Sequence, residues 1–533
     1  MNLKSIEVRL ILSLLLTAPV FLFSQNLQKD PSLKKILDLA DKESIQSRIK
    51  YLADDKLQGR KAGTPGYQMA VDYVIDQFKQ LGIEPKGDEG YLQKVILRTA
   101  KVDSAKVSFV LNDQSLRYGL DVVVMPDMNR TENSGAGQVV FVGMGISAPN
   151  LGYDDYTDID VKGKVVLMVS DIPEKFNDVE KAHFRSMPTR AELAASKGAI
   201  GVIAIEKVKT RYNMAHEGSA KGIQGTVNKN GSVSASRVPN HQNIKFYAAG
   251  TEAAFTPLFE NLKKGDLLGT VSVKSVSKHI DVNSYNVVGW IPGNDAKLKN
   301  EFIVHSAHLD HLGIRTKIKG DSIYNGAHDN ASGVACALEI AKLYKKAKLK
   351  RSILIALVTA EEMGVLGSAY FAENPPVDKT KIVADINTDM PTLLAPVLSI
   401  EPLGAWNSSL IHEVSGAAAY LSLEIMKDHV PDQFRFARSD QYSFVRAGIP
   451  AIHIKPGLKT SDPTFDLKKK IDDWTKENYH KPSDEYREDA FDWDAAITYV
   501  RLNFLIGYQI ANAKKRPAWN RGDFFGETFG MAK

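Results

Sequence analysis

Four short segments between His305 and Met390 carry side chains that bind metals and move protons. They read HSAHLDHLG, NGAHDNASG, ALVTAEEMG and ADINTDM, and a later segment, YHKPSDEY, adds one histidine. Imidazole nitrogen and carboxylate oxygen are ligands that zinc accepts, and a catalytic zinc site keeps one position open for water. The pattern therefore predicts a two-zinc hydrolytic site, and its candidate residues are His308, Asp310, Asp329, Glu361, Glu362, Asp389 and His480.

Three apolar runs next to these segments are typical of buried β-strands. They are Phe302–Val304, Ile353–Val358 and Ile382–Ile386, and a candidate group follows each run. Open α/β sheets bind their ligands at the carboxyl ends of parallel strands. We therefore expect the candidate side chains to meet at one edge of the sheet.

The spacing of the candidates suggests different roles for them. His308 and Asp310 are two residues apart at a predicted strand end, so the imidazole could bind metal while Asp310 accepts its other ring N–H. Asp329 lies in a Gly-flanked turn before a predicted helix, where a carboxylate could bridge two ions. Glu361 and Glu362 point in different directions if they end a strand, so one could bind metal while the other acts as general base.

Each of these signals alone is more often structural than functional, and only their joint occurrence at successive strand ends favours a metal site. We expect His305 and His453 to be core residues because they lie within apolar runs. His311 is expected to line the site without binding metal, and His328, which precedes the bridging position, either to support it or to lie on the surface. The single cysteine, Cys336, lies in the apolar stripe of a predicted helix and is expected to be buried in the core.

Size and charge bound the possible functions. The chain has 533 residues, 44% of them hydrophobic, which is enough for more than one domain. Its net charge of +5 is spread along the sequence, without a basic run interleaved with aromatic residues, so nucleic acid is not an expected partner.

The N-terminal segment is typical of a secretory signal peptide. Lys4 and Arg9 precede the apolar run Leu10–Phe23, which is too short for a comfortable membrane span. No later segment is long and apolar enough to cross a bilayer. We therefore expect a secreted or periplasmic protein without a membrane span.

The order of patterns along the chain predicts the fold class. Helical spacing covers residues 33–52 and 69–81, residues 207–242 resemble an exposed loop, and a large α/β pattern begins near residue 286. A β-rich stretch separates the early helices from that pattern. The sequence predicts an α/β fold with a mixed, largely parallel central sheet, helices on both faces, and an inserted β-rich module.

Together these motifs resemble those of a known family. HLDHLG, GAHDNASG, AEEMG, NTDM and YHKPSDE are similar to motifs of the zinc aminopeptidase family that includes bacterial leucyl aminopeptidases, glutamate carboxypeptidase II and the transferrin receptor. LQGRKAGTPG and RSDQYSFVRAGIPA extend the likeness over most of the mature chain. FVGMGI, YDDY and DVKGKVVLMV resemble the protease-associated domain found within many of these enzymes.

The resemblance implies a two-zinc exopeptidase fold with two zinc ions per chain. It assigns His308, Asp329 and Asp389 to one ion, and Asp329, Glu362 and His480 to the other. It implies that Glu361 is the general base, that Asp310 orients His308, and that the peptide bond between Asp329 and Asn330 is cis. The implied domains are a signal peptide (1–25), a first part of the peptidase domain (26–119), the protease-associated domain (120–276), the main part of the peptidase domain (277–515) and a C-terminal tail (516–533).

The expected function is a secreted aminopeptidase that acts on peptide or protein N-termini. A single-zinc glutaminyl cyclase-like acyltransferase, a carboxypeptidase and a non-catalytic binding protein of the same fold stay open as alternatives. Relatives often have Ser-Asp-His where this chain has Ser439-Asp440-Gln441, which puts a substrate contact in question rather than a metal ligand. Tyr442 is a candidate for stabilising the oxyanion. No pattern indicates the preferred N-terminal residue, the role of the inserted domain or the oligomeric state.

Overall fold

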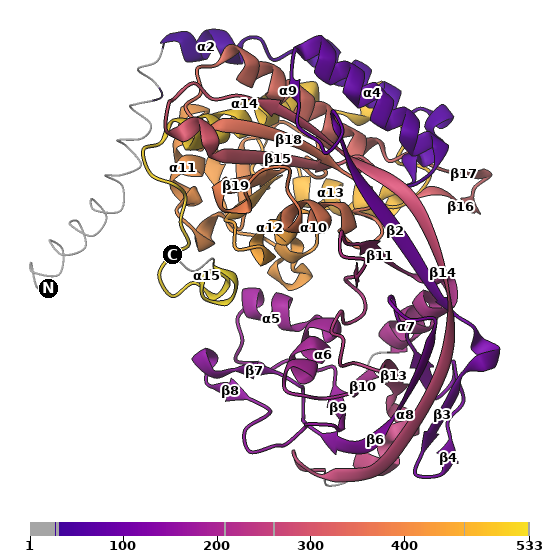
Figure 1. Cartoon of the computed structure of the whole chain (residues 1–533). Helices are drawn as coiled ribbons and strands as arrows, with labels where there is room; N and C mark the ends of the chain where they lie inside the picture. The colour runs from indigo at the N-terminus through magenta and orange to yellow at the C-terminus, as the bar shows by residue number, and fades with distance from the viewer. Residues whose placement is uncertain (1–26, 28–30, 207–208, 260–261, 463, 531–533) are drawn as a thin grey trace, which may run out of the picture. The chain divides into compact units, whose positions relative to one another are not determined.

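The computed structural model describes the chain except residues 1–26, 28–30, 207–208, 260–261, 463 and 531–533. The predicted signal peptide, residues 1–25, lies outside the described residues. The chain divides into two compact units (Figure 1): unit 1 comprises residues 1–95 and 284–533, and unit 2 comprises residues 96–283. The predicted insertion, residues 120–276, lies within unit 2.

Four parallel strands form the centre of unit 1. In spatial order they are β18 (Ser352–Val358), β15 (Phe302–His308), β19 (Ile382–Asn387) and β22 (Ala451–Pro456). The antiparallel strands β14 (Leu267–Ile291) and β20 (Ser399–Leu403) extend the sheet beside β18 and β22. The largely parallel, mixed sheet predicted from the sequence is therefore confirmed.

Helices cover both faces of this sheet, which explains its composition. Figure 1 shows α9 (Ser332–Lys346) and α14 (Trp493–Asn512) on one side, and α10 (Leu366–Glu373) and α12 (Gln441–Arg446) on the other. Every residue of β15, β18 and β19 is buried. Strands covered on both faces lack the alternation of polar and apolar residues, so they appear in the sequence as continuous apolar runs.

The start of unit 1 differs from the prediction of one long helix. Two helices, α2 (Pro31–Leu37) and α3 (Lys42–Leu52), stand in its place. The chain breaks between them because Asp41 acts as the N-cap of α3 and accepts the backbone N–H of Ser44 at 3.0 Å. The next helix, α4 (Pro65–Leu81), begins earlier than predicted, with Thr64 at its N-cap.

The remaining elements of unit 1 complete its layers. They are α11 (Leu410–Tyr420), α13 (Leu467–Asn478), α15 (Phe524–Phe529), β1 (Glu84–Pro85), β21 (Glu424–Ile425) and the hairpin of β16 (Gly313–Ile318) with β17 (Asp321–Tyr324). Cys336 is buried in α9, as predicted. The apolar face of α9 packs with side chains of α3, α14 and the sheet in one large core.

Unit 2 contains a second sheet. Its parallel strands are β6 (Glu132–Phe141), β9 (Val165–Val169), β10 (Gly201–Glu206) and β13 (Phe246–Thr251), flanked by the antiparallel strands β3 (Ser108–Leu111), β14 and β5 (Val122–Val124). Its helices are α5 (Asp178–Phe184), α6 (Met187–Ser196), α7 (Lys209–Lys221) and α8 (Glu252–Phe259). Two apolar clusters fill the space between these layers.

The prediction that residues 207–242 form an exposed loop was wrong. The segment contains α7, β11 (Ile223–Val227) and β12 (Val233–Ser234). β11 pairs with β2 (Leu92–Val102), a strand more than a hundred residues earlier in the chain. The few apolar side chains of the segment, including Ile223 and Val233, join the core. A pattern too sparse to indicate structure locally is thus stabilised by a distant partner.

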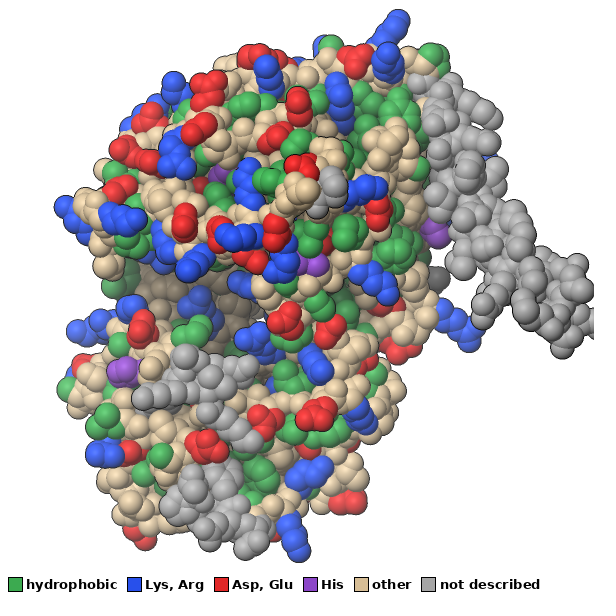
Figure 2. All heavy atoms as spheres, turned by 180° about the vertical axis from the view of Figure 1, so that it is seen from behind, with side chains coloured by type: hydrophobic (Ala, Val, Ile, Leu, Met, Phe, Trp, Pro, Cys, Tyr) green, Lys and Arg blue, Asp and Glu red, His purple; other side chains and the backbone are tan. Residues whose placement is uncertain are grey.

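The surface carries charges of both signs. Figure 2 shows Lys and Arg side chains intermixed with Asp and Glu side chains on the face that it presents. Within the described part of the chain, every helix is too short or too polar to cross a membrane.

Glu413 in α11 leads to a pH-dependent stability prediction. Burial raises the pKa of its carboxyl group from 4.5 to about 7. The folded state therefore binds a proton more tightly than the unfolded state, and folding becomes less favourable as the pH rises from about 4.5 to 7. Glu413→Gln is neutral at every pH. We expect it to raise the free energy of unfolding by about 1 to 3 kcal/mol at pH 8 and by little at pH 4.

Urea unfolding of both proteins at the two pH values measures this difference. Glu424→Gln is the matched control, because Glu424 is exposed on the surface of the same unit. An equal effect of Glu413→Gln at both pH values would show that the buried carboxylate carries no penalty.

Candidate metal centre

The predicted ligands meet at the carboxyl edge of the parallel sheet. His308 is the last residue of β15, Glu362 follows β18, and Asp389 follows β19. Asp329 lies in the turn before α9, and His480 follows α13. Each lies where a strand or a helix ends, so rigid elements position all five side chains.

The first group of donors surrounds His308. Its Nε2 lies 3.3 Å from Asp329 Oδ1 and 3.3 Å from Asp389 Oδ1. Two ligand atoms about 2.0 to 2.1 Å from a tetrahedral zinc ion are separated by about 3.3 Å. The three donors are therefore spaced as the ligands of one zinc ion.

The second group is arranged in the same way. His480 Nε2 lies 3.2 Å from Asp329 Oδ2 and 3.3 Å from Glu362 Oε2. Asp329 thus presents one carboxylate oxygen to each group, which is the arrangement of a carboxylate that bridges two ions. The donor chemistry, nitrogen and carboxylate oxygen, also suits zinc.

His311 also lies beside the second group, since its ring nitrogen falls within 4.8 Å of carboxylate oxygens of Asp329 and Glu362. Its Nδ1 is 2.7 Å from Glu362 Oε1. That separation is too short for two ligands of one zinc ion and is that of an ion pair. The geometry therefore favours His480 as the ligand and His311 as the group that holds the other oxygen of Glu362.

Asp310 contacts its neighbours differently from the sequence expectation. His308 Nδ1 donates to the main-chain oxygen of Asp310 at 3.1 Å, while the carboxylate oxygen Oδ1 is 4.0 Å away. The carboxylate instead accepts the backbone N–H of Glu361 at 3.0 Å and that of Glu362 at 3.4 Å. Asp310 therefore fixes the tautomer of His308 through its carbonyl, and fixes the two glutamates through its side chain.

The proximity of the charges shifts the pKa values at the site. Burial lowers the pKa of His308, but hydrogen bonds to the carboxylates of Asp329 and Asp389 more than offset this and place it well above its usual range. Burial and the nearby carboxylate of Glu362 raise the pKa of Glu361 well above its usual range. A glutamate with a raised pKa is suited to accept and return a proton near neutral pH.

Asn330 joins the segments that carry the donors. Its side-chain Nδ2 donates to the carbonyl of Thr388 at 2.9 Å. Its Oδ1 accepts the backbone N–H of Met390 at 3.0 Å and that of Gly333 at 3.1 Å. One amide thus connects the Asp329 turn, the start of α9 and the segment of Asp389. The peptide bond before Asn330 is cis, as the family resemblance predicts.

Asp484 also positions the bridging carboxylate. Its Oδ1 accepts the backbone N–H of His328 at 2.9 Å, and its Oδ2 accepts that of Asp329 at 3.1 Å. The ring of His328 stacks on Phe491, with centroids 4.1 Å apart. Of the two expectations for His328, support of the turn and a place on the surface, the structure shows the first, whereas no pattern in YHKPSDEY indicated a role for Asp484.

The predicted core histidines are buried, and one of them also touches the site. His305 Nε2 lies 2.7 Å from the hydroxyl of Tyr344, within the core. His453 Nε2 donates to the main-chain oxygen of Asp389 at 2.8 Å, and Lys455 Nζ donates to the same oxygen at 2.8 Å. These two side chains therefore hold the backbone of Asp389.

Gln441 and Tyr442, for which the sequence suggested roles near the substrate, contact other side chains and the backbone of unit 1. Gln441 Oε1 accepts the amide of Asn387 at 2.7 Å, and its Nε2 donates to Phe436 O. Tyr442 packs its ring against Phe436 and Phe525. Gln441 thus anchors the end of β19 two residues before Asp389.

Arg60 is a residue of the site that sequence reasoning missed. Its side chain is 1% exposed and donates to four main-chain carbonyls, those of Leu52, Leu309, Asn325 and Gly326. Leu309 follows His308, and Asn325 and Gly326 precede the Asp329 turn. One guanidinium therefore joins two of the three segments that supply the first group of donors, those of His308 and Asp329. The signal was LQGRKAGTPG, in which an arginine lies next to a glycine.

Arg60→Lys should weaken zinc binding while the protein stays folded. Lysine keeps the charge but lacks the planar fork that reaches four carbonyls. Losing a group that supports metal ligands typically lowers metal affinity about 10- to 100-fold. Competition with a chelator on the metal-free protein measures this affinity.

Arg351→Lys is the matched control for this experiment. Arg351 is also buried and donates to the carbonyls of Ile510 and Ala513, but it precedes β18 at the opposite edge of the sheet. Wild-type zinc affinity in Arg60→Lys, or an equal loss in Arg351→Lys, would contradict a specific role for Arg60.

Comparisons with known proteins show which proteins this chain resembles. Residues 286–505 match the model of peptidase family M28. A probable lipoprotein aminopeptidase, LpqL, of Mycobacterium tuberculosis is 23% identical over 466 residues, which cover 82% of this chain and 78% of that protein. An aminopeptidase of Pseudomonas aeruginosa is 26% identical over 351 residues, covering 62% of this chain and about half, 53%, of that protein.

The solved structures that resemble this chain include an aminopeptidase from Aneurinibacillus sp. strain AM-1. It has a TM-score of 0.49 and 20% identity, and the likeness covers 91% of this chain and 97% of that one. The range matched by the family model runs from the end of β14 into α14 and contains all the candidate residues from His308 to His480. Residues 286–505 therefore match peptidase family M28, and this match and the aminopeptidase relatives support a zinc metallopeptidase.

Proposed function

We propose that the protein is a two-zinc exopeptidase that hydrolyses the N-terminal bond of peptides. The observation that carries this proposal is the position of Asp329, whose two carboxylate oxygens lie 3.3 Å and 3.2 Å from two different histidines. In this proposal one ion is held by His308, Asp329 and Asp389, and the other by Asp329, Glu362 and His480.

The residues of the chain divide the remaining work among them. Zinc held by these donors would polarise a carbonyl group and would lower the pKa of water toward neutrality. Glu361 takes the proton of the attacking water and returns it to the leaving amine, a role that its raised pKa supports. Asp310 fixes Glu361 by accepting its backbone N–H.

The direction of cleavage is inferred from the relatives. Both the Mycobacterium tuberculosis protein and the Pseudomonas aeruginosa protein are called aminopeptidases. An aminopeptidase requires the free α-amine of its substrate. Blocking that amine should therefore abolish hydrolysis, whereas a carboxypeptidase would tolerate the block.

The test is a panel of aminoacyl-anilides and of N-acetylated peptides with free C-termini, with metal analysis of the same sample. We expect release of aniline from the unblocked substrates only, with two zinc ions per chain. Cleavage of the N-acetylated peptides from their C-termini would reject the aminopeptidase assignment. One zinc ion per chain with an intramolecular acyl transfer would reject the hydrolytic one.

We further propose that residues 120–276 form a protease-associated domain and that the protein acts outside the cytoplasm. The first part rests on the motifs FVGMGI, YDDY and DVKGKVVLMV. The second rests on the basic and apolar pattern of residues 1–25. Expression of the full chain in a secreting host, followed by N-terminal sequencing, tests the second part. A mature protein that begins near residue 26 is the expected result, and an intact Met1 would contradict it.

A further inference from the structure

The hairpin of β16 and β17 is attached to the candidate metal centre at both of its ends. β16 begins two residues after His311, whose Nδ1 lies 2.7 Å from Glu362 Oε1. β17 ends at Tyr324, five residues before Asp329. The turn of the hairpin lies at the periphery of unit 1 (Figure 1). A ligand bound along the hairpin would therefore lie next to the site of hydrolysis.

A tight turn gives the hairpin a defined shape. Ile318 pairs with Asp321, so only Lys319 and Gly320 connect the two strands. Both connecting residues have a positive φ, of 49° and 99°. Positive φ at both central positions is a feature of the type I′ turn, whose twist matches that of paired strands. The side chains of the hairpin are therefore presented on an ordered element.

The hairpin carries three cations without an acidic partner. Arg315, Lys317 and Lys319 are all exposed. Within the part of the chain that the structure describes, no Asp or Glu forms an ion pair with any of them. Asp321, the acidic residue of the hairpin, accepts the backbone N–H of Ile323 at 2.9 Å instead. The three positive charges are therefore available to an anionic ligand.

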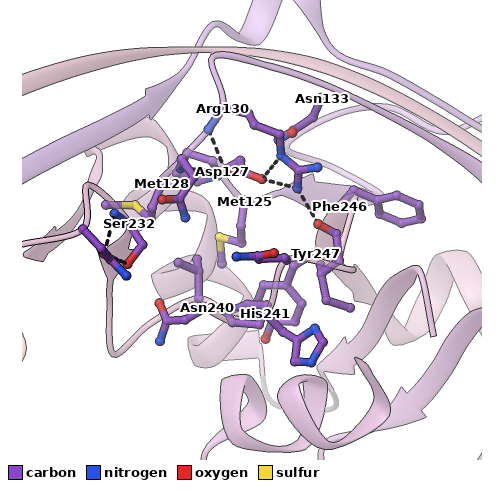
Figure 3. Close-up of a pocket in the computed structure, with 17 residues that line it drawn as sticks. Met125, Asp127, Met128, Arg130, Asn133, Ser232, Asn240, His241, Phe246 and Tyr247 are labelled. Atoms are coloured by element: carbon purple, nitrogen blue, oxygen red, sulfur yellow. Dashed lines mark hydrogen bonds and ion pairs between the residues drawn. The ribbon is translucent and has the colours of Figure 1, made fainter. Parts of the chain in front are cut away.

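Cations elsewhere in the chain show what local neutralisation looks like. In unit 2, Asp127 Oδ2 accepts Arg130 Nε at 2.8 Å beside a cavity (Figure 3). In unit 1, Lys459 Nζ lies 2.7 Å from Glu424 Oε2. The charges of such pairs largely cancel, whereas unpaired charges of one sign add up to a field that attracts the opposite sign. The hairpin therefore presents a positive field beside the metal centre.

The same segment of β16 also exposes apolar surface. Ile314 and Ile318 are 57% and 38% exposed. The register of the ladder shifts between them, and residues 315–317 have no residue paired with them on β17. A chain bound here would cover the two isoleucines as well as pair with the cations between and beside them.

We propose that the hairpin binds an acidic segment of the peptide substrate, downstream of the bond that is cleaved. This inference rests on the proposed function, because an exopeptidase that removes the first residue leaves the rest of its substrate outside the metal centre. Arg315 and Lys319 are four and eight residues after His311, so they lie within about 14 Å and 29 Å of it. An extended peptide spans these distances with about four to eight residues.

A membrane surface is the other partner that basic and apolar residues can fit. The attachment of the hairpin favours a peptide. Arg60 donates to the carbonyls of Asn325 and Gly326, directly after β17, and to that of Leu309, shortly before β16. One buried side chain thus holds both ends of the hairpin beside the metal donors, where the downstream part of a substrate must pass.

The test uses two C-terminally amidated peptides that share their first three residues and carry three glutamates or three lysines at the next three positions. Their first residue is the one that the full chain releases fastest from an aminoacyl-anilide. We expect the KM of the glutamate peptide to be at least about tenfold lower than that of the lysine peptide at low salt, because attractive pairs replace repulsive ones. At about 1 M salt, where the Debye length is about 3 Å, the two KM values should become nearly equal.

A triple variant of the hairpin should lose this preference. It combines Arg315→Gln, Lys317→Gln and Lys319→Gln, and the ratio of its two KM values should approach one at low salt. Both KM values come from one protein sample, so a smaller folded fraction does not change their ratio. The matched control removes the same charge from exposed residues before β18, at the opposite edge of the sheet, and should keep the wild-type ratio; it combines Lys346→Gln, Lys348→Gln and Lys350→Gln.

The outcomes separate this inference from the proposed function. Hydrolysis of the anilide with equal KM values for the two peptides at low salt would overturn the inference and leave the proposed function standing. A wild-type ratio in the hairpin variant, or an equal loss in the control, would also overturn it. Equal KM values together with binding of the wild type, but not of the hairpin variant, to phosphatidylglycerol vesicles would assign the hairpin to a membrane surface instead. Failure to hydrolyse the anilides and both peptides would reject the proposed function and this inference with it.

Discussion

Glu361→Gln should lower the turnover number by about 10²- to 10⁴-fold while both zinc ions stay bound. Glutamine keeps the size of the side chain but cannot take up and return a proton. Within each of the two groups, the donor atoms lie 3.2 to 3.3 Å from the histidine nitrogen. Glu361 belongs to neither group, so the metal content should not change. The turnover number on an aminoacyl-anilide and the zinc content of the same sample measure both parts of this prediction.

Glu362→Gln separates the two neighbouring glutamates. Glu362 Oε2 lies 3.3 Å from His480 Nε2, so replacing this carboxylate should weaken the binding of one zinc ion. Added zinc should then restore part of the activity. Zinc content therefore distinguishes the two variants even if both hydrolyse the substrate slowly. Loss of zinc in Glu361→Gln with full zinc in Glu362→Gln would reverse the two assignments.

Asp329→Ala should have the second largest effect. Its carboxylate gives one oxygen to each group of donors, so its removal takes a ligand from both ions. We expect the zinc content to fall from two ions per chain to below one, and hydrolysis to fall at least about 10⁴-fold, because both metal positions are lost together. Metal analysis after dialysis and the aminoacyl-anilide assay check the two expectations.

Asp385→Asn is the matched control for Asp329→Ala. Asp385 is also buried, in β19, where burial raises its pKa well above the usual range, and asparagine keeps the shape of its side chain. Its side chain accepts the hydroxyl of Ser306, two residues before His308, at 2.8 Å. This variant should keep both ions. Retention of one ion in Asp329→Ala would instead show that Asp329 serves a single metal position.

The sequence was most informative where chemistry and strand ends coincide. His308, Glu362 and Asp389 come after continuous apolar runs, which are typical of buried parallel strands. Their meeting at one edge of the sheet could therefore be predicted. Asp329 and His480 follow no strand of the parallel sheet, so no strand end supported their choice as candidates, and the family resemblance was needed to assign them to particular ions. Their contact at 3.2 Å depends on the packing of the segment after α13 against the turn before α9.

The supporting contacts could not be predicted, because they join positions that are distant in the sequence. Arg60 is 249 residues from Leu309, whose carbonyl it binds, and Asp484 is 155 residues from Asp329. Neither residue type has a pattern that indicates such a role. The loop predicted at 207–242 was wrong for the same reason, since β11 forms only against β2.

Local capping explains the smaller errors in the helices. Asp41 stops the first helical pattern because its carboxylate caps α3, a signal that apolar spacing does not contain. Thr64 and Pro65 start α4 four residues before the first residue of the predicted helix, Met69. Capping residues and proline at the first helical position are thus better guides to helix ends than hydrophobic periodicity.

The most direct test of the central claim is the anomalous scattering of zinc in crystals of the metal-bound protein. The proposal predicts two peaks about 3.5 to 4 Å apart, on either side of the Asp329 carboxylate. One should lie against His308 and Asp389, and the other against His480 and Glu362. A single peak between these residues, or a second peak bound by His311 in place of His480, would contradict the two-zinc site proposed for this peptidase.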